Sequence, residues 1–120
     1  MQAMTKEVLE QIYNSYLSAY SIPDPEERAR VLRHCVTDEI ASVLPYEESR
    51  GLDELSHHIE QFQKKRWGSH FRSKILAVHH SQFLAELTLH GEDDQLLATA
   101  QTYGRFNERG LLTYLIGFFF

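Results

Sequence analysis

The sequence predicts an α+β domain in which three amphipathic helices are followed by a curved antiparallel sheet. Apolar residues repeat every three to four positions in the first half of the chain and every second position from Ser69 onward. Polar turn signals divide this second half into four strands, at 79–81, 91–94 and 107–110. The short connections favour an antiparallel meander. The 120 residues have the usual length of one domain, which we expect to span residues 1–120.

The helices are predicted from apolar spacing and from their boundaries. In Thr5–Tyr20 the apolar and aromatic side chains share one helical face. The Pro-Asp-Pro sequence at 23–25 ends this segment and begins a second helix, because proline disfavours helical geometry at the residue before it but suits the first turn. We expect the second helix to end by Thr37. A third helix is predicted from Leu52 to Arg66.

The strand predictions rest on alternation. A brief strand is expected at Ile40–Tyr46, and Glu47–Gly51 is expected to form a polar turn before the third helix. The four later strands are expected at Phe71–Val78, Gln82–His90, Gln95–Phe106 and Leu111–Phe119. The third of these carries small residues on its inner face, namely Ala98, Ala100, Thr102 and Gly104. Small side chains there leave room for a cavity between the helices and the sheet.

The closing strand is apolar on both faces, which predicts a covered outer surface. Tyr114, Ile116 and Phe118 share the outer face, and Tyr103 of the preceding strand is expected beside them. A second copy of the chain would cover such a patch, so we expect a homodimer through the outer face of the sheet.

Composition excludes several classes of function. A net charge of −5 argues against a nucleic-acid binder. No apolar run is long enough to span a bilayer, and the first seven residues lack the basic start and apolar stretch of a signal peptide. Cys35 is the single cysteine, which fits a reducing cytoplasm. The seven histidines show no metal-ligand spacing, so we expect neither a metal nor another cofactor.

Several short motifs together resemble the nuclear-transport-factor-2-like superfamily, in particular its SnoaL-like bacterial members, steroid isomerases included. They are Pro23–Arg28, Thr37–Ile40, Arg50–Leu55, Gly104–Gly110 and Ile116–Phe119. The resemblance covers nearly the whole chain. It implies a cystatin-like cone, in which the helices pack in the concave face of a strongly bent antiparallel sheet around a deep pocket. Members are commonly dimers through the outer sheet face. The superfamily includes isomerases, dehydratases, cyclases and proteins without catalysis, so the fold does not settle the function.

Residue by residue, the resemblance to the steroid isomerases is partial. Tyr16 matches the tyrosine that donates a hydrogen bond to the developing enolate in those enzymes. Their two catalytic aspartates correspond to Leu44 and Thr102 here, and neither side chain can transfer a proton near neutral pH. Glu47 is a candidate base if it points into the pocket, although a glutamate in a turn is more often solvated.

Two classes of function remain open from the sequence. One is a non-catalytic domain that binds a small apolar molecule, and the alternative is an isomerase, dehydratase or cyclase that transfers protons on an apolar substrate. The tyrosines of the first helix can also be plain core, and Trp67 can cover the pocket or simply close the third helix. The predicted ligand-binding residues are Tyr16, Tyr20, Leu44, Phe62, Trp67, Phe83, Leu87, Thr102 and Phe119.

Overall fold

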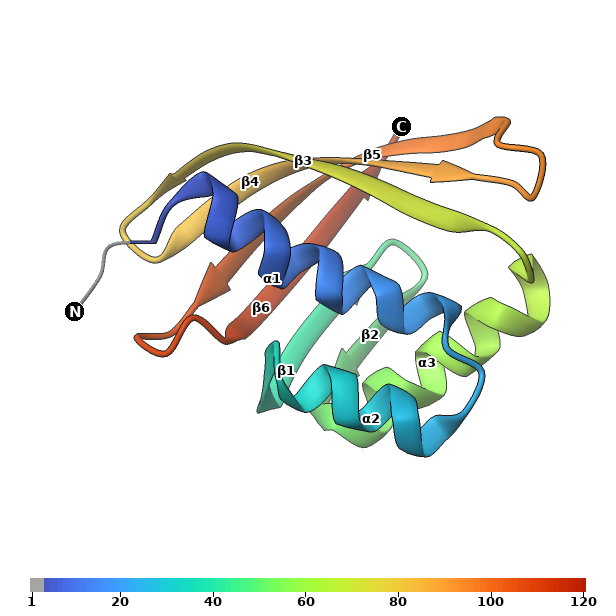
Figure 1. The fold of residues 1–120 in the computed structure, drawn as a ribbon, viewed down its shortest axis with the longest axis horizontal. Coiled ribbons are helices and arrows are strands. Elements are labelled where there is room, and N and C mark those ends of the chain that lie inside the picture. Colours follow the sequence, from blue (N-terminus) through green and yellow to red (C-terminus); the bar gives the residue numbers. More distant parts are fainter. Residues whose placement is uncertain (1–3) are drawn as a thin grey trace.

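Three helices pack against one curled six-stranded sheet in the computed structural model, which describes residues 4–120 (Figure 1). This arrangement confirms the predicted α+β class. Residues 1–3, on which the signal-peptide expectation partly rests, lie outside the described residues. No helix in the described part of the chain is long and apolar enough to cross a membrane.

The helical elements are α1 (Lys6–Ser18), a 3-10 turn η1 (Ala19–Ser21), α2 (Pro25–Arg33) and α3 (Gly51–Arg66). The beginnings of α1 and α2 differ in how they are capped. The hydroxyl of Thr5 accepts a hydrogen bond from the backbone N–H of Val8 at 3.2 Å and so caps α1. Asp24 stands at the N-cap position of α2, but its side chain makes no capping hydrogen bond.

The strands are β1 (Val36–Leu44), β2 (Glu47–Arg50), β3 (His70–His79), β4 (Gln82–His90), β5 (Leu96–Phe106) and β6 (Leu112–Phe119). Their order in the sheet is β2-β1-β6-β5-β4-β3. β3 to β6 form the predicted antiparallel meander. The pair β1 and β6 is parallel, which makes the sheet mixed. β1 and β6 are connected by most of the chain and not by a hairpin. Turn signals in the sequence therefore could not predict whether these two strands pair in parallel or antiparallel.

The predicted polar turn at Glu47–Gly51 is wrong. The turn consists of Pro45 and Tyr46, and the next four residues form β2, which pairs with β1. Gly51 follows at a φ of +85°, a left-handed conformation that glycine adopts without strain, and α3 begins there. The short hairpin places Glu47 opposite Leu44, at the edge of the space between the helices and the sheet.

The inner face of the sheet has the predicted parity. Ala100, Thr102 and Gly104 of β5 are all buried, and α1 runs along this side of the sheet (Figure 1). Gly104 leaves a gap that the ring of Phe83 fills, since a Cβ at Gly104 would stand 2.4 Å from two ring atoms. The remaining core joins all the helices and the strands. Its large apolar side chains that are less than 2% exposed are Leu9, Tyr13, Leu32, Ile40, Leu55, Ile59 and Leu112.

Candidate functional site

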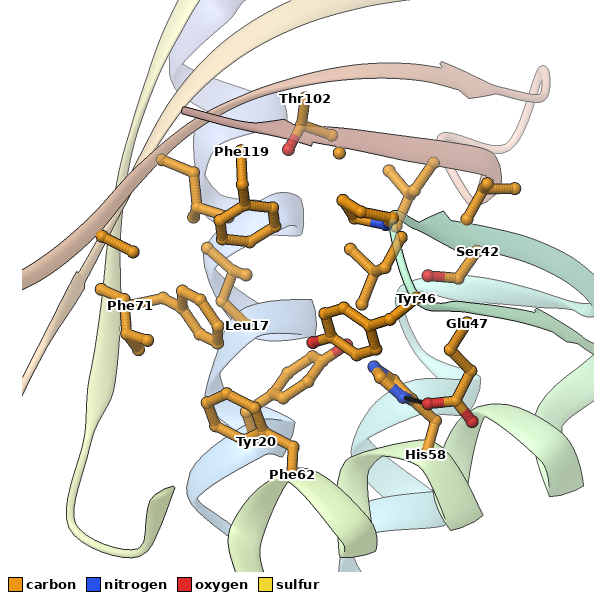
Figure 2. Close-up of a pocket in the computed structure, with 18 of the residues that line it drawn as sticks. Leu17, Tyr20, Ser42, Tyr46, Glu47, His58, Phe62, Phe71, Thr102 and Phe119 are labelled. Carbon is orange, nitrogen blue, oxygen red and sulfur yellow. Dashed lines mark hydrogen bonds and ion pairs between the residues drawn. The ribbon is translucent and has the colours of Figure 1, made fainter. Parts of the chain in front are cut away.

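A cavity of about 510 Å³ lies between α1, α3, the β1–β2 hairpin and the inner face of the sheet. Its walls are mostly aromatic and aliphatic, and they come from segments far apart in the sequence (Figure 2). Eight of the predicted site residues line it: Tyr16, Tyr20, Leu44, Glu47, Phe62, Leu87, Thr102 and Phe119. A volume of this size suits a small organic molecule.

Two predicted ligand-binding residues lie outside this cavity. Phe83 does face inward, but its ring packs against Gly104 and makes an edge-to-face contact with Tyr13, with ring centroids 5.6 Å apart. It therefore belongs to the core beneath the cavity. Trp67 is 62% exposed, because the chain leaves the helical conformation there and turns away at Gly68, whose φ is +85°. Its indole borders a separate surface hollow instead.

Three tyrosines of α1 and η1 bring hydroxyl groups to the cavity. The hydroxyls of Tyr16 and Tyr20 lie 3.1 Å apart and share one hydrogen bond. Tyr13 donates a hydrogen bond to the hydroxyl of Thr102 at 3.0 Å. Burial raises the pKa of each of these tyrosines above its usual value, and their hydrogen bonds only partly oppose this for Tyr13 and Tyr16. They therefore remain neutral hydrogen-bond donors through the physiological range.

His58 and Glu47 form a hydrogen-bonded pair in the wall of the cavity. His58 is 2% exposed, and its Nδ1 contacts the Glu47 carboxylate (Figure 2). An ionised carboxylate only accepts hydrogen bonds, so the proton of a neutral His58 ring lies on Nδ1 and the lone pair on Nε2. Nε2 is the one buried side-chain nitrogen or oxygen without a hydrogen-bond partner in the described part of the chain. In Figure 2 it points away from Glu47 toward Tyr46 and the interior.

The ring of His58 packs against the rings of two tyrosines. Its ring lies edge-to-face with the ring of Tyr20, at 6.1 Å between centroids, and 6.3 Å from the ring of Tyr46. Tyr46 is 68% exposed and stands at the mouth. The site thus combines an unpartnered ring nitrogen, a carboxylate that orients it and a hydroxyl pair nearby. A base and hydrogen-bond donors on opposite sides of a bound carbonyl group can remove a neighbouring proton and stabilise the resulting oxyanion.

The sequence-based reasoning named Glu47 and allowed that a histidine could line the pocket, but it did not single out His58 among the seven. The signal was the position of this histidine on the apolar stripe of α3. His58 lies three residues after Leu55 and four before Phe62, on the face that packs inward. A histidine buried on such a face needs a polar partner. Glu47, which precedes the helix, is that partner. Across residues 4–120, no group of three histidine, cysteine, aspartate or glutamate side chains could hold a metal ion.

Comparisons with known proteins give matches among solved structures alone. No protein-family model matches the chain, and no curated protein matches it. A proposed isomerase of the SnoaL-like family from Agrobacterium tumefaciens superposes with a TM-score of 0.79 at 20% sequence identity, over 92% of this chain and 95% of that one. A protein of unknown function with a cystatin-like fold from Nostoc punctiforme gives 0.74 at 14% identity, over 100% and 96%. An NTF2-like protein of unknown function from Exiguobacterium gives 0.67 at 14%, over 91% and 98%.

Proposed function

From the cystatin-like cone that this chain shares with NTF2-like and SnoaL-like proteins, and from its cavity, we propose that it binds a small, mostly apolar molecule and transfers a proton on it. One observation carries the proposal. His58 is buried in the wall of the cavity with Nδ1 held by Glu47 and Nε2 unpartnered. A buried polar atom without a partner costs stability, and a ligand atom in the cavity would supply the partner.

In this mechanism His58 is the general base. Its Nε2 takes a proton from a carbon next to a carbonyl group, and the Glu47 carboxylate stabilises the imidazolium that forms. Tyr16 and Tyr20 have one hydroxyl proton each, and one of the two is donated in the hydrogen bond between them. The other proton is free to stabilise the negative charge on the carbonyl oxygen. Return of the proton from His58 to a different carbon completes an isomerisation.

Glu47 therefore has a role different from the one that the sequence suggested. It was a candidate base in its own right, but its carboxylate is engaged by His58. Glu47 acts as a positioning residue that fixes the tautomer and the orientation of the ring. The proposed isomerase from Agrobacterium tumefaciens, which has the same fold, is compatible with this reaction class.

A non-catalytic binding domain is the second candidate. It is favoured by Leu44 and Thr102, which occupy the positions of the two steroid-isomerase aspartates and line the same cavity. Thr102 accepts a hydrogen bond from Tyr13 and is thereby engaged in holding the wall together. In this reading the cavity stores or carries an apolar molecule, and the Nε2 atom of His58 binds a polar group of that molecule.

Exchange of carbon-bound hydrogen in D₂O separates these two functions. The probe is an apolar ketone such as 2-acetylnaphthalene, with loss of its α-proton signal followed by NMR. We expect the wild-type protein to accelerate exchange and His58→Gln to abolish the acceleration. His57→Gln is the matched control, since His57 is the exposed neighbour of His58. Binding of the ketone without exchange would support the non-catalytic function, and equal exchange by His58→Gln would contradict the assigned base.

We also propose that two copies associate through the outer face of the sheet. The support is the set of apolar side chains that β5 and β6 present on that face. Phe118 is 55% exposed and Leu97 is 37% exposed, while Tyr114 and Ile116 are partly exposed beside them. The rings of Tyr103 and Tyr114 contact each other on this face, at 6.4 Å between centroids. Burial of this surface by a second copy would stabilise a dimer.

A further inference from the structure

The mouth of the cavity carries two positive side chains beside walls that are mostly apolar. Lys65 and Arg66, in the last turn of α3, line the cavity together with Tyr46 and Gln61 at its rim. Within the described residues, neither Lys65 nor Arg66 has a carboxylate partner within 4.0 Å. The charge of Arg66 also opposes the rise in the pKa of the Tyr46 hydroxyl, which places the two on the same rim.

Their place in the lining of the cavity distinguishes Lys65 and Arg66 from an ordinary charged helix end. Positive residues are common in the last turn of a helix because they offset the partial negative charge of its C-terminus. All three cations of this turn are exposed, and Lys64 fits this explanation fully, since it does not line the cavity. Lys65 and Arg66 also border the cavity, where their charges act on a bound molecule.

Helix geometry relates these charges to the proposed base. His58 and Lys65 are seven residues apart on α3, which is two turns and about 10 Å along the axis, so both lie on one face of the helix. Phe62 stands between them on that face and points into the cavity (Figure 2). A molecule lying along α3 therefore meets the Nε2 atom of His58 at one end, an aromatic wall in the middle and two cations at the other end.

We infer that the ligand of this cavity is an apolar molecule with one anionic group, a carboxylate, which binds to Lys65 and Arg66 at the mouth. This inference rests on the proposed function, because it concerns the ligand of the same cavity. The carboxylate pairs with the ammonium and guanidinium groups at the solvent edge, where it keeps part of its hydration. The apolar body lies along Phe62 and Phe71, and the group that reacts lies near His58.

Calorimetric titration with a matched pair of probes tests the inference. The probes are 6-phenylhexanoic acid and 6-phenylhexanamide at pH 7.5, which share size and apolar surface and differ in charge. We expect the acid to bind about tenfold more tightly than the amide. This ratio should fall toward one in the Lys65→Gln/Arg66→Gln double variant, with little change in amide binding. Added salt should weaken binding of the acid alone.

Lys64→Gln and Lys65→Gln provide the matched comparison. Both remove one positive charge from the same helical turn, but only Lys65 lines the cavity. We expect Lys64→Gln to leave the ratio between acid and amide unchanged. Equal binding of acid and amide to the wild-type protein would overturn the inference and leave the proposed function standing. Failure of both probes to bind at millimolar concentration would overturn both the inference and the proposed function.

Discussion

Substitution of Gly104 by alanine tests how the floor beneath the cavity is packed. A Cβ at this position would lie 2.4 Å from the Cε1 and Cζ atoms of Phe83 and 3.0 Å from the Cδ2 atom of Leu115. Both neighbours are at least 97% buried, and the Phe83 ring already makes an edge-to-face contact with Tyr13. Because the ring is buried and already packed against Tyr13, it can make room for the new methyl group only by displacing its neighbours.

The expected cost follows from two opposing effects. Forcing a methyl group into a packed core typically costs about 1–3 kcal/mol. Alanine also restricts the unfolded chain more than glycine does, which stabilises the folded state by about 0.4–1 kcal/mol. We expect Gly104→Ala to lower the free energy of unfolding by about 1–2 kcal/mol. For a domain of this size the melting temperature should fall by about 4–8 °C.

Urea denaturation followed by tyrosine and tryptophan fluorescence measures the change, and Gly117→Ala is the control. A Cβ at Gly117 would stand 3.2 Å from the end of the Leu44 side chain, which borders the cavity and has room to shift. We expect that variant to stay within about 0.5 kcal/mol of the wild type. A double variant with Phe83→Leu should recover stability beyond the additive sum. Wild-type stability of Gly104→Ala would refute the argument that the Phe83 ring can pack here only because residue 104 has no side chain.

Three further predictions concern pH, a buried hydrogen bond and assembly. Burial raises the pKa of the Cys35 thiol from 9.0 to about 12, so the unfolded state loses this proton first and the free energy of unfolding should fall from about pH 9 upward. Urea midpoints at pH 7.5 and 10 measure this, and an equal fall in Cys35→Ala would exclude the thiol as a contributor. Thr102→Val removes the acceptor of the Tyr13 hydroxyl and should cost about 1–3 kcal/mol, whereas an unchanged midpoint would mean that the hydroxyl finds another partner. Light scattering at micromolar concentration should give the wild-type protein twice the chain mass of 14.0 kDa. The Tyr114→Glu/Ile116→Glu variant should be a monomer, and a monomeric wild type would contradict the dimer.

The sequence was sufficient to predict the fold where its signals were local. Helical spacing, the Pro-Asp-Pro sequence and the alternation after Ser69 each depend on neighbouring residues, and the elements they predict are present. The parity of β5 was also predictable, because Ala100 and Thr102 had to share a face with Gly104. The parallel pairing of β1 with β6 was not predictable from local signals, since the sequence of neither strand indicates which distant strand it pairs with.

The candidate site shows the same division. Single residues such as Tyr16 and Thr102 could be assigned to the cavity from the periodicity of their own helix or strand, which shows which face they share. The pairing of His58 with Glu47 depends on where the β1–β2 hairpin meets α3, and the segment that carries Glu47 had been assigned to a turn. Trp67 was misplaced because a glycine after a helix indicates that the chain turns but not in which direction the preceding side chain points.

The central position of β6 has a consequence for how the molecule assembles. β6 reaches β5 through a short loop, but it pairs with β1 across more than half of the chain. The meander of β3 to β6 can therefore form early, whereas closure of a long loop delays the docking of β1. During synthesis, β1 and β2 emerge well before β6 exists, so one edge of β1 stays unpaired. The exposed edge of β1 is then where an incompletely made chain is most open to pairing with another chain.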